Sequence, residues 1–79
     1  MTRAELLEKF RSTATEIAER DFGTVKEDGV IADLGIDSLG MLEIIGSMER
    51  EFDIRVPDDK LVGIQTVSQL IELVETRLN

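Results

Sequence analysis

Three stretches of the chain carry apolar residues at intervals of three and four, the spacing that brings side chains to one face of a helix. The first stretch opens with Thr2 and Glu5, which are spaced as a capping box, and ends near residue 20. Its apolar positions are Leu6, Leu7, Phe10, Ala14, Ile17 and Ala18. We therefore expect an amphipathic helix with one buried side.

The second stretch predicts a helix from about Ser38 to Phe52. Its core face gathers Met41, Ile44, Ile45, Met48 and Phe52. The opposite face collects Leu39, Glu43, Gly46 and Arg50, with Leu42 and Glu49 on its flank. A single exposed leucine is ordinary, but Leu39 next to a serine and Leu42 one turn later indicate the start of a docking patch.

A proline and a second capping box organise the C-terminal third of the chain. Pro57 cannot continue the preceding helix, and the acidic residues after it favour a short helical turn that runs to about Val62. Thr66 and Gln69 then open the third amphipathic helix. Its apolar positions are Val67, Leu70, Ile71, Val74 and Leu78.

The connection between the first two long helices, residues 21–37, holds too many apolar residues to be a loose linker. We expect a packed loop that Ile31, Leu34 and Ile36 pin against the helices, because a structureless loop of this length is uncommon in a compact domain. No strand-like alternation is present. The sequence therefore predicts an all-α fold, a small four-helix bundle of three longer helices and one short helix, in a single domain over residues 1–79.

The composition excludes several classes of function. The chain has 79 residues with no cysteine and no histidine, so it lacks disulfides, the usual zinc ligands and the usual general base. Its formal charge is −8, which repels nucleic acid and anionic membranes and attracts basic protein surfaces. No apolar run has spanning length, and no leader-like segment opens the chain. We expect a cytoplasmic monomer that binds neither nucleic acid nor membrane.

Ser38 follows a glycine-punctuated loop and stands at the predicted start of the second helix, where its hydroxyl faces solvent. Catalysis by this serine is disfavoured, because a serine nucleophile needs a neighbouring base and Asp37 is a poor one. A second interpretation is that Asp37 or Ser38 only caps the helix. A third is that a phosphate-bearing group modifies the hydroxyl, since helix N-termini attract anions and Gly35 and Gly40 leave the approach open.

A longer pattern favours the third interpretation. Its positions are Leu34, Gly35, Asp37, Ser38, Leu39, Glu43, Glu49, Phe52, Pro57 and Asp58. With this pattern, residues 30–58 resemble acyl carrier proteins, and the length, acidity and helix order of the whole chain are similar to theirs. The resemblance implies a phosphoprotein rather than an enzyme. A phosphopantetheinyl transferase would attach 4'-phosphopantetheine from coenzyme A to Ser38, and the thiol of this arm would hold acyl groups as thioesters.

The resemblance also implies which surface the partner enzymes contact. The matching positions are Asp37, Leu39, Leu42, Glu43 and Glu49. Ketosynthases, acyltransferases and related synthases would approach this acidic face with basic docking surfaces. Such contacts raise encounter rates more than lasting affinity, which suits a carrier that must release its partner.

Three departures from the family pattern bear on the pathway. Gly46 stands where fatty-acid carriers have a larger apolar residue, Arg50 adds a positive charge, and Ile36 is typical of polyketide-type carriers. We therefore favour a polyketide or other specialised acyl pathway over fatty acid synthesis, and an aminoacyl carrier is less favoured still. The alternative from another class is an unmodified helical adaptor that binds basic partner proteins through Leu39 and Leu42.

Overall fold

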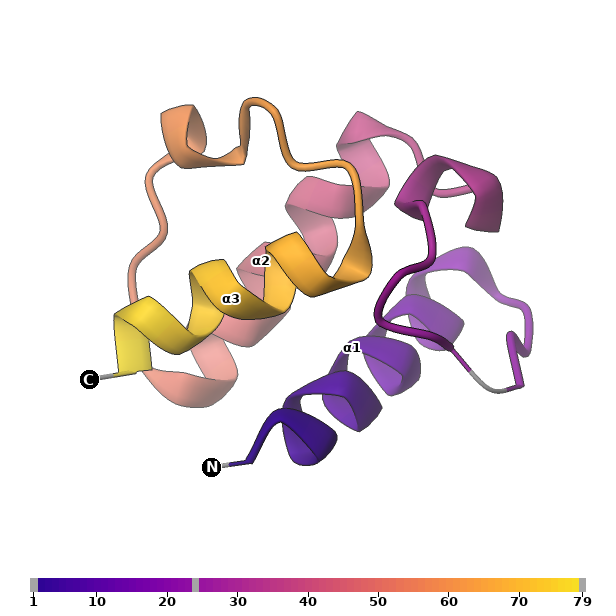
Figure 1. The fold of residues 1–79 in the computed structure, drawn as a ribbon, viewed down its shortest axis with the longest axis horizontal. Helices are drawn as coiled ribbons and strands as arrows, with labels where there is room; N and C mark the ends of the chain where they lie inside the picture. The colour runs from indigo at the N-terminus through magenta and orange to yellow at the C-terminus, as the bar shows by residue number, and fades with distance from the viewer. Residues whose placement is uncertain (1, 24, 79) are drawn as a thin grey trace.

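Three α-helices and two short 3₁₀ helices make up the fold. The structure is a computed structural model that describes residues 2–23 and 25–78. The α-helices are α1 (Arg3–Ala18), α2 (Ser38–Phe52) and α3 (Val67–Leu78), and the 3₁₀ helices are η1 (Ile31–Leu34) and η2 (Asp58–Leu61). The predicted all-α fold is confirmed, as are the bounds of the second helix (Figure 1). The short helix expected after Pro57 is η2, whereas η1 was not predicted.

Helices α1 and α2 run side by side in opposite directions, and α3 packs against α1 (Figure 1). Lys9 in the first half of α1 forms an ion pair of 3.2 Å with Glu51 near the end of α2. The three helices and both 3₁₀ helices contribute to one buried cluster. Its members are Leu6, Phe10, Ala14, Val25, Ile31, Ile36, Ile44, Ile45, Met48, Val56, Leu61, Val67, Leu70, Ile71 and Val74.

The helix starts follow the sequence closely. At α1 the Thr2 side chain accepts the Glu5 N–H at 3.1 Å, and the Glu5 carboxylate accepts the Thr2 N–H at 2.9 Å, as the capping box predicts. A second capping box precedes α3: the Thr66 N–H donates to the Gln69 side-chain oxygen at 2.9 Å, and the Gln69 N–H donates to the Thr66 hydroxyl at 3.2 Å. Helix α1 ends at Ala18, two residues before the expected end, because Glu19 adopts a left-handed conformation with φ of 55°.

The long connection between α1 and α2 is packed, as predicted. Ile31 and Ile36 are buried and Leu34 is half-buried. The connection is also tied to the segment before α3, because the Ile31 N–H donates to the Gln65 carbonyl at 2.8 Å and the Val67 N–H donates to the Gly29 carbonyl at 3.0 Å. These bonds flank an isolated antiparallel bridge between Val30 and Thr66.

Arg3 holds the start of α1 against the long connection and against α3. Its guanidinium forms ion pairs with Glu27 in the connection and with Glu75 on α3, the latter at 2.6 Å, and it donates to the Ser68 hydroxyl at 3.1 Å. The hydrogen bonds to Glu27 and Glu75 raise the pKa of Arg3. No helix among the described residues is both long and apolar enough to cross a bilayer.

Candidate functional site

Ser38 is the first residue of α2, and its side chain is exposed, as the sequence predicts. The preceding residue, Asp37, is the N-cap: its carboxylate accepts the Gly40 N–H at 2.8 Å and its carbonyl accepts the Met41 N–H at 2.9 Å. Of the two candidate caps, the structure therefore selects Asp37. Since Asp37 supplies the capping bond, the Ser38 hydroxyl is not needed to start the helix.

Two glycines shape the approach to Ser38. Gly35 ends η1 in a left-handed conformation with φ of 81°, which turns the chain from η1 toward α2. A Cβ atom on Gly40 would lie 3.1 Å from Cγ2 of Ile36 and 3.3 Å from Oδ1 of Asp37. A side chain at residue 40 would therefore press on both the buried Ile36 and the capping carboxylate. The local packing therefore favours glycine at residue 40, and the glycine also leaves the serine accessible.

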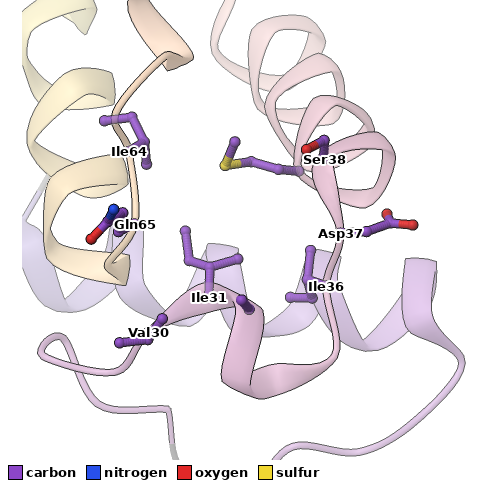
Figure 2. Close-up of a pocket in the computed structure, with 9 residues that line it drawn as sticks. Val30, Ile31, Ile36, Asp37, Ser38, Ile64 and Gln65 are labelled. Atoms are coloured by element: carbon purple, nitrogen blue, oxygen red, sulfur yellow. The ribbon is translucent and has the colours of Figure 1, made fainter.

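An apolar cavity of about 450 Å³ opens beside Ser38. Its walls come from η1, the start of α2 and the segment before α3, so it lies where the backbone bonds to Gly29 and Gln65 join the two loops. Figure 2 shows Ile31, Ile36 and Ile64 around this space, with the Asp37 carboxylate directed away from it. A volume of this size falls within the range of pockets that hold small molecules, about 300–1,000 Å³.

The surroundings of Ser38 contain nothing that would make it a nucleophile on its own. The cavity is lined by Val30, Ile31, Ala32, Ile36, Asp37, Ser38, Met41, Ile64 and Gln65. Among these residues, which all lie in the described part of the chain, there is no lysine, and the protein has no histidine. The Asp37 carboxylate is already engaged with the Gly40 N–H. The site is therefore suited to receiving a group from another enzyme rather than to activating its own serine.

The outer face of α2 next to Ser38 carries both apolar and acidic side chains. Leu39 is 64% exposed and Leu42 is 42% exposed, so both leucines lie on the surface, as expected. Glu43, one turn after Leu39, is also exposed. The structure thus brings Asp37, Leu39, Leu42 and Glu43 together on the outside of the first two turns of α2.

Glu49 stands apart from that group because it has a structural contact that the sequence did not reveal. Its carboxylate accepts the Val56 N–H at 2.8 Å, and its carbonyl accepts the Ile54 N–H at 3.1 Å. The side chain is half-buried. Glu49 therefore holds the turn after α2 against the helix. Its bond to Val56 forms because the chain reverses direction after Asp53, the C-cap residue of α2.

Comparison with known proteins connects this geometry to a family. The family model described as the phosphopantetheine attachment site matches residues 4–74. The chain is 36% identical to the acyl carrier protein of Prochlorococcus marinus, over 98% of both chains. It is 38% identical to the acyl carrier protein of Phenylobacterium zucineum, over 95% of this chain and 96% of that one. The chain belongs to the acyl carrier protein family.

Solved structures of acyl carrier proteins share the fold. The crystal structure of an acyl carrier protein from Thermotoga maritima superposes with a TM-score of 0.90 at 33% identity, over 96% of this chain and 89% of that one. The solution structure of the acetyl actinorhodin acyl carrier protein from Streptomyces coelicolor has a TM-score of 0.75 at 26% identity, over 99% and 91% of the two chains. The resemblance found in the sequence is confirmed.

Family membership fixes the general role of the chain. It is an acyl carrier protein, and acyl carrier proteins are carriers rather than enzymes. Its prosthetic group is a covalently attached 4'-phosphopantetheine, as expected from the sequence. The exposed serine at a helix start, with an apolar cavity beside it, fits such a group, because the hydroxyl is reachable and the backbone there favours a phosphate.

Proposed function

We propose that the Ser38 hydroxyl is the attachment point of the 4'-phosphopantetheine arm, within a single carrier domain over residues 1–79. The observation that carries this proposal is the exposure of Ser38 as the first residue of α2, in a chain that the attachment-site family matches over residues 4–74. A phosphopantetheinyl transferase moves the arm from coenzyme A to this oxygen, and the terminal thiol of the arm holds acyl cargo as a thioester.

The start of α2 suits a phosphodiester for two reasons. The first amides of a helix have no acceptor within the helix, and the macrodipole places partial positive charge there. Asp37 takes the Gly40 amide, so its carboxylate lies on one side of the helix start while the Ser38 hydroxyl opens to solvent and to the cavity (Figure 2). The cavity offers an apolar surface to whatever the arm carries.

The surface that partner enzymes contact is proposed to be the exposed group next to the arm: Asp37, Leu39, Leu42 and Glu43. These side chains combine apolar area with negative charge, which a basic enzyme surface complements. Glu49 belongs to the same proposed surface, at its far end, where its carboxylate also accepts the Val56 N–H. The transferase, ketosynthases and acyltransferases are the partners that this face would serve, and the cytoplasmic location remains a prediction.

For the pathway, we favour polyketide or other specialised acyl assembly over fatty acid synthesis. The support is the absence of a side chain at Gly46 and the positive charge of Arg50 on the outer face of α2. The test is to load the arm with a panel of acyl groups and measure extension by polyketide-type and fatty-acid ketosynthases. Faster extension by fatty-acid ketosynthases would overturn this pathway assignment and leave the carrier role intact.

Incubation with coenzyme A, magnesium and a promiscuous phosphopantetheinyl transferase tests the attachment site itself. Intact-protein mass spectrometry should show the gain of one arm in the wild type and in Ser12→Ala, a control serine on α1, and no gain in Ser38→Ala. No gain in the wild type, with a transferase that modifies another carrier in parallel, would favour the unmodified adaptor that docks through Leu39 and Leu42.

A further inference from the structure

A second hollow lies in the groove between α1 and α2, and its lining residues come only from these two helices. Its volume is about 400 Å³. Ile17 and Leu42 supply its apolar surface, Thr13 and Ser47 add hydroxyl groups, and Gly46, one turn after Leu42, contributes no side chain. A smaller hollow of about 220 Å³ shares Ile17 and reaches Leu39. The groove therefore extends from the start of α2, next to Ser38, to the middle of the helix.

Gly46 is not required by the fold. A Cβ atom there would meet only Nη1 of Arg50, at 3.6 Å, an ordinary contact with the end of a flexible side chain. Gly40 is different, because a Cβ atom on it would lie 3.1 Å from buried Ile36. Glycine inside a helix destabilises it relative to alanine, since the backbone loses more freedom on folding. Residue 46 therefore costs the helix stability, and what the glycine provides is the open hollow.

The charges around the hollow indicate what chemistry would fill it. Glu16 on α1 and Glu43 on α2 lie at its rim, both exposed, and Arg50 lies one turn beyond Gly46 at the other end. Two carboxylates on one side favour cations in the partner there, and the guanidinium disfavours a cation at the far end. The whole chain carries a charge of −8, which strengthens the preference for a basic partner.

We propose that this hollow receives a protruding apolar side chain of a partner synthase, with lysine or arginine residues of that partner placed on Glu16 and Glu43. The proposal rests on the carrier function proposed above and adds α1 to the docking surface. In this arrangement the partner supplies the protruding residue and the carrier supplies the receiving space. A side chain buried in a pocket of the partner can carry much of the binding energy of an interface, and exposed charges around the pocket raise the rate of encounter.

Filling the hollow tests the proposal. Gly46→Met places a flexible apolar side chain in it, and Gly46→Ala is the matched control, since it adds only the Cβ atom that the structure accommodates. Both variants should fold at least as stably as the wild type, because both improve helix propensity. With a ketosynthase that extends the wild-type holo-protein, Gly46→Met should raise KM by about tenfold at little change in kcat, as expected when an apolar contact is lost. Gly46→Ala should stay within about twofold of the wild-type KM, because one methyl group takes up little of the space. An unchanged or lower KM for Gly46→Met would overturn the proposal, because it would mean that a larger residue adds to the docking patch.

Two further measurements locate the contact without relying on turnover. Titration of the ¹⁵N-labelled protein with the ketosynthase should shift the amide signals of Glu16 and Ile17 on α1 together with those of Leu42 and Gly46 on α2. Shifts confined to α2 would contradict the proposal. Glu16→Lys should weaken binding more than Glu72→Lys, an equal charge change at an exposed position on α3.

The loading assay separates this inference from the carrier function on which it rests. Every variant named here should still gain one arm when the reaction with the promiscuous transferase is run to completion, as judged by intact mass. If Gly46→Met is loaded normally and its KM is unchanged, the proposed docking hollow is wrong and the carrier function stands. If the wild type is not loaded, the carrier function itself is wrong.

Discussion

Replacing Asp37 with alanine should destabilise the protein without blocking access to Ser38. The Asp37 carboxylate accepts the Gly40 N–H at 2.8 Å and is the side-chain cap of α2. Alanine at this position leaves that amide without its side-chain acceptor. Asparagine keeps an oxygen acceptor of the same size and removes only the charge, so the pair of variants separates the hydrogen bond from the electrostatics.

The expected magnitude follows from the single bond that is lost. Loss of an N-cap costs typically about 1 kcal/mol, and in a domain of this size about 1 kcal/mol lowers Tm by roughly 4–8 °C. Asp37→Asn loses only the favourable interaction of the carboxylate with the helix dipole, about 0.3–1 kcal/mol, and it also removes one charge from a protein with a net charge of −8. These two effects of Asp37→Asn oppose each other, so its Tm should fall by less than half as much.

The assay is thermal unfolding followed by circular dichroism at low and at physiological ionic strength, with arm loading measured on the same samples. Asp37→Ala should melt several degrees lower than Asp37→Asn, and both should still gain the arm when the transferase reaction is run to completion. Because the proposed docking face includes the charge of Asp37, Asp37→Asn should also slow transfer to a basic ketosynthase while remaining folded. Equal losses of Tm in the two variants would refute the capping explanation, since the charge alone would then account for the effect.

Three more properties can be measured on the purified protein. Glu49→Gln should keep the bond to the Val56 N–H and Glu49→Ala should lose it, so hydrogen exchange at Val56 should accelerate only in the alanine variant; equal exchange would show that the bond contributes nothing. Bonds from Thr2 lower the pKa of Glu5, so its stabilisation is complete above the ordinary glutamate pKa of about 4.3 and is lost as pH falls through the lower folded value. The stability difference between wild type and Glu5→Gln should therefore shrink in acid, and a difference independent of pH would contradict this. Added salt or magnesium should raise Tm by screening charge repulsion, because the chain has 17 acidic residues and only 9 basic ones. A Tm that does not change with ionic strength would mean that the charges are well paired.

Local signals made much of the fold predictable. The capping boxes at Thr2 and Thr66 and the proline at residue 57 fix helix ends through bonds or clashes between near neighbours in the sequence. The periodicity of α2 predicted its bounds and the buried Ile44, Ile45 and Met48. Met41 and Phe52, assigned to the same face, are only half-buried: Met41 lines the open cavity beside Ser38, and Phe52 is the last residue of α2.

Contacts between distant segments were not predictable in the same way. Helix η1 lies inside the long connection, and the bond from Ile31 N–H to the Gln65 carbonyl that accompanies it joins segments far apart in the chain. The ion pairs of Arg3 with Glu27 and Glu75 have the same origin. The hollow at Gly46 also requires α1 to pack beside α2, so the sequence showed a missing side chain there and not a space for a partner.

The most direct test of the carrier assignment is the site at which the arm is attached. Trypsin cleaves after Lys26 and Arg50, and the resulting peptide, residues 27–50, contains two serines, Ser38 and Ser47. Fragmentation of this peptide from protein treated with transferase and coenzyme A should assign the phosphopantetheine to Ser38, the exposed residue at the start of α2. Attachment at Ser47, at a serine outside this peptide, or at none would contradict the account.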